Sequence, residues 1–402
     1  MPGKLRDRAT IPIFFQNFFR RFNNPKTAFR HATIRYSRCF SIPIELIVDI
    51  LLRLPVESLI RRGCVCKSLR SLTFDPRFVM THLNNTVTGI NMNMKMNLLV
   101  SHNDSLLSMY CEGSKDGDGS HLAIKKVDHP AVMDPDVCLC ILGSCNGLVC
   151  LEIGDDNSII ILWNPCTGDT KVLAQPPYHF QDKMFHGFGY DSSNEDYKIM
   201  LVTEGPSKVM MNVFSLKWNS WRTYEYLADL RTTDQQGCFL NGALHWITSG
   251  TITSLDLADE KFKEIVPLPY CGNTDYSFEG VTSDQNCLYL YNDPTEDTDF
   301  CIWKYDVKES WTRVIKISSE ILAQQVFVEV DELELKVVCI LENGEVLMDH
   351  EGKVLVSYNT KTRTFRNIIN GTEDDEFQTI TYLETLVSPV TAAEGGGGAN
   401  NM

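Results

Sequence analysis

Asn146-Gly147-Leu148-Val149-Cys150-Leu151 joins a turn signal to an apolar strand, and the arrangement returns at Asn241-Gly242-Ala243-Leu244-His245-Trp246 and at Asn343-Gly344 before Val346-Leu347-Met348. Asn-Gly suits the positive φ angles of a tight β-hairpin turn. Looser equivalents are Asn194 before Tyr197 and Asn286 before Leu288. These five units start at residues 146, 194, 241, 286 and 343, which are 48, 47, 45 and 57 residues apart. The spacing is typical of the four-stranded blades of a β-propeller.

A second turn follows each of these signals by about 15 to 21 residues, as expected for a blade of this length. The residues that open it are Asn164, Ser215, Asp256, Asp306 and Asn359, and a strand returns near Thr170, Trp221, Phe262, Trp311 and Phe365. Five blades are legible, and strands in residues 86–140 together with the end segment 377–388 complete a sixth. We therefore predict an all-β, β-propeller-like domain of about five to six blades, closed by pairing its terminal strands. The alternative is a β-sandwich with irregular hairpins.

Residues 41–55 have a helical pattern instead. Ser41 is a capping residue, Pro43 suits the first turn, and Pro55 ends the helix. Glu45, Asp49 and Arg53 form one narrow polar stripe, and the other positions are almost all apolar. Because so little helical sequence surrounds this segment, one apolar face is predicted to await a partner. The alternative is that the large C-terminal domain covers it.

Two further helices are predicted at Val56–Arg62 and about Val65–Leu72, with Asp75-Pro76 opening a last turn that carries Phe78 and Val79 inward. The run from Ile42-Pro43 through Leu51–Leu59, Cys64–Leu72 and Asp75–Phe78 resembles the three-helix F-box of plant F-box proteins, with Ile42 in place of the usual Leu and Leu69 in place of the usual Trp. The resemblance implies docking into a Skp-type adaptor and, through it, a cullin scaffold. The residues that it implies for this contact are Pro43, Leu46, Ile50, Leu51, Leu54, Pro55, Leu59, Val65, Cys66 and Lys67.

The β-rich region resembles the F-box-associated, kelch-like domain of plant F-box proteins. The matching stretches are Cys145–Cys150, Trp163–Gly168, Phe188–Asp191 with Asp196-Tyr197-Lys198, Asn241–Trp246 and Tyr382–Pro389. Kelch repeats carry a Gly-Gly pair in each blade, whereas here Gly-Gly occurs only at Gly395–Gly398. The resemblance implies a domain that binds a substrate protein, without identifying the substrate or the loops that hold it.

Charge separates the two modules. The 402 residues carry a net charge of −15. Residues 1–83 hold a net charge of +10 and the rest −25, which argues against nucleic-acid binding by the β-domain because phosphates attract clustered Lys and Arg. Fourteen Cys without paired spacings, and no apolar run near 18 residues, favour a protein of the nucleus or cytoplasm that does not span a membrane. Residues 1–38 are basic and interrupted by Pro, and we expect a disordered extension rather than a transit peptide.

No catalytic or metal motif is legible. Asp116–Ser120 imitates a calcium loop but has His121 where the turn requires Gly. The Cys-x-Cys pairs at 64–66 and 138–140 lack the second pair that zinc needs, and His245 is expected to be a core or blade-edge residue. The acidic runs Asp293–Asp299 and Glu373–Glu376 are expected to be solvated loop tips, with recognition of a basic substrate segment as the alternative.

These patterns predict a non-enzymatic adaptor without cofactors or metals. Its parts are a basic extension (1–38), an F-box (39–83), a β-propeller-like domain (84–390) and a flexible Gly-rich tail (391–402). The predicted function is substrate recognition in an SCF-type (Skp-cullin-F-box) ubiquitin ligase. The alternatives are a ligase-independent interaction scaffold and a propeller hydrolase.

Overall fold

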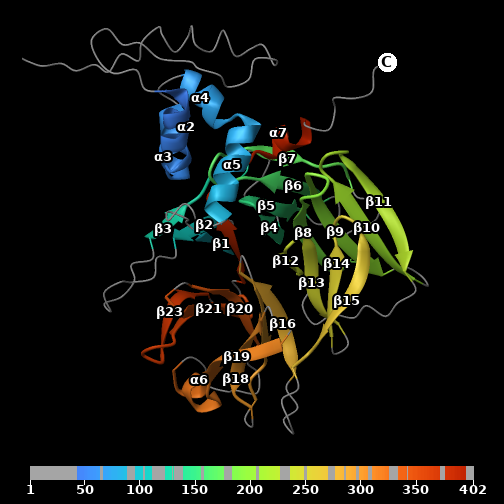
Figure 1. Cartoon of the computed structure of the whole chain (residues 1–402). Helices are drawn as coiled ribbons and strands as arrows, with labels where there is room; N and C mark the ends of the chain where they lie inside the picture. Colours follow the sequence, from blue (N-terminus) through green and yellow to red (C-terminus); the bar gives the residue numbers. More distant parts are fainter. Residues whose placement is uncertain are drawn as a thin grey trace, which may run out of the picture. The chain divides into compact units, whose positions relative to one another are not determined.

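The computed structural model describes residues 43–63, 67–87, 96–102, 105–110, 123–128, 130, 139–154, 158–175, 183–204, 208–226, 236–248, 251–269, 277–284, 287–295, 298–306, 310–325, 334–341, 343–371 and 376–394. They belong to two compact units, which divide between residues 94 and 95 (Figure 1). The predicted basic extension lies outside the described residues. Within the described ranges no helix is long and apolar enough to cross a membrane.

The first unit is helical. Its described helices are α2 (Ile44–Leu52), α3 (Val56–Gly63), α4 (Lys67–Thr73) and α5 (Pro76–Val87). Pro43 stands just before α2 as its N-cap, and the Pro43 carbonyl accepts hydrogen bonds from the amides of Leu46 and Ile47 at 3.2 and 3.4 Å. The helix ends at Leu52, earlier than the stop predicted at Pro55, because its last turn tightens around the C-cap residue Arg53.

Helix α5 corrects the prediction of three helices followed by a single turn. Asp75 caps it, since its Oδ1 accepts hydrogen bonds from the amides of Arg77 and Phe78 at 2.9 and 3.4 Å. Pro76 then occupies the first helical position, where its missing N–H costs nothing. The helix continues for 12 residues and buries Phe78, His82, Leu83 and Thr86.

The second unit contains six four-stranded antiparallel sheets (Figure 1). From inner to outer strand, blade 1 contains β24 (Gln378–Leu383), β1 (Met96–His102), β2 (Ser105–Tyr110) and β3 (Ala123–Lys126), and blade 2 contains β4 (Leu139–Cys145), β5 (Leu148–Ile153), β6 (Ile159–Trp163) and β7 (Thr170–Val172). Blade 3 contains β8 (Lys183–Asp191), β9 (Asp196–Glu204), β10 (Val209–Ser215) and β11 (Ser220–Tyr226), and blade 4 contains β12 (Cys238–Leu240), β13 (Ala243–Thr248), β14 (Thr251–Asp256) and β15 (Lys261–Pro267). Blade 5 contains β16 (Phe278–Ser283), β17 (Leu288–Asn292), β18 (Phe300–Asp306) and β19 (Ser310–Ile317), and blade 6 contains β20 (Leu335–Ile340), β21 (Glu345–His350), β22 (Val354–Asn359) and β23 (Thr364–Asn370).

The inner strands make a closed ring. Each of β24, β4, β8, β12, β16 and β20 contacts the next, and β20 contacts β24. Apolar clusters fill the spaces between neighbouring blades: for example, Phe185 and Met200 of blade 3 pack with Trp246 and Leu255 of blade 4. The domain is therefore a six-bladed propeller, and the β-sandwich alternative is wrong.

Two of the three Asn-Gly turns have the predicted chemistry at both residues, and in the third Gly344 alone has a positive φ. Asn146 and Gly147 have φ angles of 52° and 81°, and Asn241 and Gly242 have 50° and 81°, as a tight hairpin turn requires. In the second turn of blades 2, 4 and 6, the side-chain oxygen of the opening Asn or Asp accepts hydrogen bonds from the amides two and three residues later. The residue four positions on then has a positive φ: Gly168, Glu260 and Arg363. These local bonds explain why the turns could be read from the sequence.

Blade 1 closes the ring as predicted. Strand β24 pairs antiparallel with β1, in a register that runs from Met96↔Leu383 to Ser101↔Gln378. The chain then crosses to blade 2, where Nδ2 of Asn164 donates hydrogen bonds to the carbonyls of Thr385 and Val387 at 3.1 and 2.7 Å. Thr385 Oγ1 donates to the Asn146 carbonyl at 2.9 Å. Closure thus has two parts, a strand pair in blade 1 and a polar latch on blade 2.

Among the described residues of the second unit, two short helices accompany the sheets. Helix α6 (Ser319–Gln325) lies between blades 5 and 6 in the chain, and α7 (Pro389–Glu394) follows the latch. Helix α7 occupies the start of the segment that we predicted as a flexible tail from residue 391. The Gly-rich remainder, residues 395–402, lies outside the described residues.

Candidate functional site

Among the described residues of the first unit, the most exposed large apolar side chains lie on α2. Leu46 and Ile50 are 53% and 54% exposed, and they are one helical turn apart on the same face. Pro43, also exposed, precedes Leu46 by three positions and extends this face by a further turn. We call Pro43, Leu46 and Ile50 the α2 stripe. Large apolar side chains that a folded unit leaves in water on one helix face indicate a docking surface.

A polar stripe borders the α2 stripe, as predicted. Glu45, Asp49 and Arg53 are exposed, and Arg53 NH2 lies 3.0 Å from Asp49 Oδ2. An exposed ion pair of this kind contributes little stability, about 0.3–0.5 kcal/mol. The polar stripe therefore contributes little to the stability of the folded unit, and its charged side chains keep this side of α2 hydrated.

The structure separates the predicted adaptor-binding residues into two groups. Leu51 and Leu59 are 3% and 0% exposed, so in this structure they pack inside and shape the surface from beneath. Leu54 and Pro55 are half-buried at the corner between α2 and α3, which we call the α2–α3 corner (residues 53–55), and Lys67 is exposed at the start of α4. Val65 and Cys66 lie outside the described residues. Leu69, the departure from the usual Trp, is half-buried on α4.

Sequence reasoning missed His82. Its Nε2 donates a hydrogen bond to the carbonyl of Leu54 at 3.0 Å, so α5 is tied directly to the α2–α3 corner. The available signal was the spacing of Phe78, His82 and Thr86, which places three residues on one helix face. It went unread because only a turn was predicted there.

In the propeller, the inner strands surround a narrow central channel with a cavity of about 120 Å³. The residues that line it come from all six blades and are mostly small, apolar or neutral polar, with Lys336 as the charged one among them. Gln236 accepts a hydrogen bond from Lys336 Nζ at 3.3 Å.

A second cavity, of about 330 Å³, lies between blades 5 and 6 and shares Lys336 with the channel. Its charged lining residues are Glu279, Asp293, Glu334, Lys336, Asp349 and Glu351. Burial, together with the neighbouring charge of Glu279 and a hydrogen bond with it, raises the pKa of Asp293 to about 7. Burial also raises the pKa of Asp349, although the Gly352 amide and Thr379 Oγ1 donate to its carboxylate at 2.9 and 3.1 Å. The cavity is acidic, and burial disfavours the ionised form of two of its carboxyl groups, those of Asp293 and Asp349.

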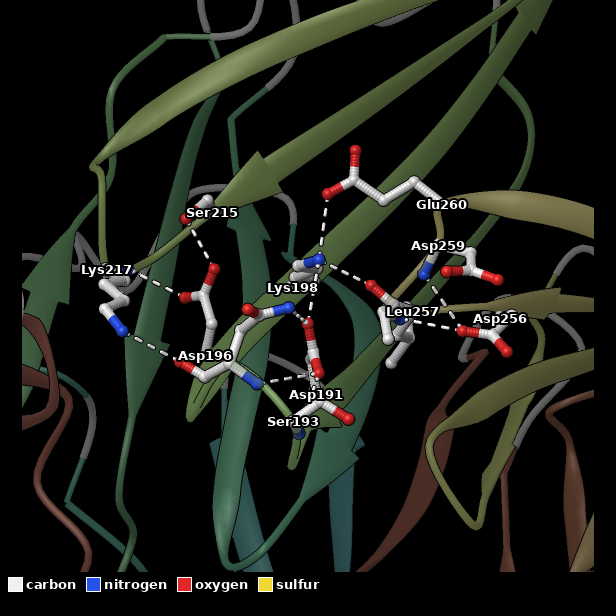
Figure 2. Close-up of polar contacts among 12 residues, drawn as sticks. Asp191, Ser193, Asp196, Lys198, Ser215, Lys217, Asp256, Leu257, Asp259 and Glu260 are labelled. Atoms are coloured by element: carbon white, nitrogen blue, oxygen red, sulfur yellow. Dashed lines mark hydrogen bonds and ion pairs between the residues drawn. The ribbon is translucent and has the colours of Figure 1, made fainter.

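A buried ion-pair network joins blades 3 and 4 (Figure 2). It lies near the carboxyl end of the inner strand β8, whereas the acidic cavity lies near the amino ends of the inner strands β16 and β20. Lys198 of β9 is 3% exposed and lies 3.1 Å from Asp191 Oδ2 and 2.9 Å from Glu260 Oε1. Its ammonium also donates to the Leu257 carbonyl at 2.5 Å. Burial by itself would raise the pKa of Asp191, but hydrogen bonds from Asn194 and Lys198 outweigh it and lower that pKa. Asp191, Lys198, Leu257 and Glu260 therefore fasten neighbouring blades.

The motifs that carry the kelch-like resemblance are thus structural. Asp191 and Lys198 fasten blades 3 and 4, and Asn164 and Thr385 form the latch. Gly147 belongs to the same latch, because a Cβ there would lie 2.2 Å from Thr385 Oγ1. These side chains hold the ring together and are not available as a substrate-recognition surface.

Of the residues considered for catalysis or metal binding, the structure describes His245 and Cys140. His245 is buried on β13, and burial lowers its pKa to about 4, so it is neutral at pH 7. Among the described residues, no group of three or more His, Cys, Asp or Glu side chains could hold a metal ion. The calcium-like loop at 116–120 and both Cys-x-Cys pairs, apart from Cys140, lie outside the described ranges.

Comparison with known proteins agrees with both modules. An F-box-like family model matches residues 39–86, and the F-box associated beta propeller domain matches residues 91–390. The Arabidopsis thaliana F-box protein At3g07870 is 26% identical, over 86% of this chain and 91% of that protein. The F-box/kelch-repeat protein At3g23880 is also 26% identical, over 87% and 96%, and F-box protein CPR1 is 28% identical, over 69% and 73%, both from the same plant. Helical unit, six-bladed ring and matched families together show that the chain belongs to the plant F-box proteins with a C-terminal F-box associated β-propeller domain.

Proposed function

We propose that this protein is the substrate-recognition subunit of an SCF-type ubiquitin ligase, acting in the nucleus or cytoplasm. Its F-box docks a Skp-type adaptor, which links it to a cullin scaffold, and its propeller binds a substrate protein. The observation that carries the proposal is the α2 stripe, which exposes Leu46 and Ile50 within a matched F-box. Family membership supports the adaptor role in general.

The α2 stripe suits recognition of a groove in a partner. Burying a Leu or Ile side chain completely stabilises a complex by roughly 1.5–3 kcal/mol, so covering the exposed half of each contributes about 1 kcal/mol. Side chains three and four positions apart are the anchors of helix-in-groove recognition. The buried Leu51 and Leu59 beneath the surface keep these anchors in fixed positions before binding.

The proposed mechanism is proximity and needs no catalytic group of the chain's own. The F-box fixes the receptor to the ligase while the propeller holds the substrate, and the local concentration of substrate lysines near the transferred ubiquitin rises. The ends of blades 1 to 4 that carry the latch and the Lys198 network have structural roles. We therefore propose that substrate contacts use the loops at the other end of the strands.

The first experiment measures binding of the full chain to a purified Skp-type adaptor by isothermal titration calorimetry. Replacing Leu46 and Ile50 together by Asp should reduce affinity more than a hundredfold, because charges would then enter an apolar groove. The α2–α3 corner gives a second arm: Leu54→Ala with Pro55→Gly should also abolish binding. A matched control is Glu45→Ala with Asp49→Ala on the neighbouring stripe, which should leave affinity within about threefold.

Circular dichroism must show the propeller's thermal transition unchanged in all variants, since the F-box is a separate unit. Wild-type protein that binds no Skp-type adaptor, or a Leu46/Ile50 variant that binds as tightly as wild type, would falsify the docking proposal. A receptor that binds the adaptor but increases ubiquitination of no protein captured by proximity labelling would contradict the substrate half and favour a scaffold.

A further inference from the structure

We infer that His82 is a positioning residue for adaptor docking: from α5 it holds the α2–α3 corner in the conformation that the adaptor recognises. The inference rests on the proposed function and assigns a role to a residue outside the docking set read from the sequence. It is carried by one contact, the hydrogen bond of 3.0 Å from His82 Nε2 to the Leu54 carbonyl, which joins residues 28 positions apart.

The corner needs such a support because the helices themselves supply little. The α2 helix ends at Leu52, and the amides of Arg53 and Leu54 turn back to Ile50 and Leu51 at 3.2 and 3.1 Å. Pro55 has no N–H to donate, and its carbonyl already begins α3 by accepting from the Leu59 amide at 3.2 Å. Between these two helix ends lies the Leu54–Pro55 peptide, and its carbonyl oxygen is the atom that His82 binds.

His82 is built to hold that carbonyl. It is 4% exposed, and its ring stacks on Phe78 of the preceding turn, with the ring centroids 6.2 Å apart. A carbonyl only accepts hydrogen bonds, so Nε2 must carry the proton. Burial lowers the pKa of His82 below its ordinary value, which keeps the ring neutral at pH 7, and the bond to the carbonyl selects the neutral tautomer with its proton on Nε2.

Helix α5 is itself well anchored, so the donor's position is set before docking. Its start is capped by Asp75, and Phe78 and Leu83 are 5% and 3% exposed. Thr86 Oγ1 donates to the His82 carbonyl at 2.8 Å, a bond that stays within the helix. Removing the imidazole should therefore release the corner without unfolding α5.

Two substitutions separate the hydrogen bond from the space that the side chain fills. His82→Leu introduces an apolar side chain of similar bulk that has no hydrogen-bond donor, and we expect about a tenfold loss of adaptor affinity. His82→Gln restores an N–H at a similar reach and should stay within about threefold of wild type. Thr86→Val is the matched control, because it removes a buried hydrogen bond from the same helix without touching the corner, and affinity should not change.

A double-mutant cycle in the full chain shows where His82 acts. In a Leu54→Ala background the corner is already impaired, so His82→Leu should cost clearly less than it does in wild type. In an Ile50→Ala background, away from the corner, the two losses should add. Equal affinity of His82→Leu and wild type, or additive losses with Leu54→Ala, would overturn the inference.

Amide hydrogen exchange separates this outcome from failure of the proposed function. Without any adaptor, the amides of Val56 to Leu59 should exchange faster in His82→Leu than in Thr86→Val. Faster exchange in a chain that binds no Skp-type adaptor would uphold the contact's role at the corner and reject the docking function. Unchanged exchange would refute the positioning role whatever the adaptor does.

Discussion

Leu69 stands where the F-box resemblance leads us to expect Trp, and the structure places it half-buried on α4. If an aromatic ring normally fills a pocket at this position, Leu69→Trp should tighten adaptor binding by at most about 1–2 kcal/mol, through the apolar area that the indole adds. Titration calorimetry of the two proteins gives the answer. Weaker binding of the Trp variant would mean that this F-box has repacked around leucine.

Asp293 should make stability depend on pH. Its pKa is about 7 in the folded protein and about 4 in an unfolded chain, so the folded state binds the extra proton between these values. The free energy of unfolding therefore falls as pH rises from about 4 to 7. Asp293→Asn cannot ionise, and it should raise the melting temperature relative to wild type at pH 8 but change it little at pH 5.

Glu351, on the same cavity, provides a control of opposite sign. A hydrogen bond from Lys353 lowers its pKa, so its charged form contributes stability above pH 4–5 that is lost on acidification. Glu351→Gln should thus lower the melting temperature slightly at pH 8. If the melting temperatures of wild type and Asp293→Asn depended on pH in the same way, folding would not raise the pKa of Asp293.

At the scale of strands and turns, the Lys198 network should decide how firmly blades 3 and 4 hold together. Lys198→Met leaves Asp191 buried without its cation, whereas Glu260 keeps its ion pair with Arg222, and the substitution should destabilise the propeller by about 3 kcal/mol in denaturant unfolding. Lys263→Met is the matched control, since it removes an ion pair of 2.8 Å whose lysine is 51% exposed, and it should cost far less stability than Lys198→Met. Equal losses from the two substitutions would contradict a special role for the buried network.

The elements that the sequence predicted are those fixed by local chemistry. The Asn or Asp residues that open the second turns bond to their own backbone neighbours, and Asn146-Gly147 and Asn241-Gly242 adopt the positive φ angles of a tight turn, so these positions mark the strands without knowledge of the fold. Helix α5 was not predicted, because its burial comes from contacts with α2 and α4, which a single turn signal cannot reveal. The role of His82 was missed for the same reason.

At the scale of the whole domain, β24 should be indispensable. Deleting residues 377–402 removes the inner strand of blade 1 and the latch, exposes the inner edge of β1, and should cause aggregation or loss of the cooperative thermal transition. Deleting residues 395–402, which leaves α7 in place, should change nothing measurable. Adaptor binding should survive both truncations. Two truncated proteins that melt like the full chain would show that closure is not needed for stability.

The acidic cavity is a feature of the ring that no stretch of sequence displays. Glu279, Asp293, Glu334 and Asp349 are spread over 70 residues, and only the side-by-side placement of blades 5 and 6 brings them together. The repeat period predicted that blades exist and follow one another. It could not predict which side chains face each other across the gap between two blades, because that depends on strand register and twist.

The pairing of the first and last strands also sets an order in time. Strand β1 leaves the ribosome about 290 residues before its partner β24 is complete. At 5–20 residues per second, blade 1 must wait for roughly 15–60 seconds with an inner edge that nothing else in the ring can cover. A chain truncated before β24 cannot pair the inner edge of β1, so that edge stays exposed. A closed propeller can therefore form only when translation has reached the end of the domain.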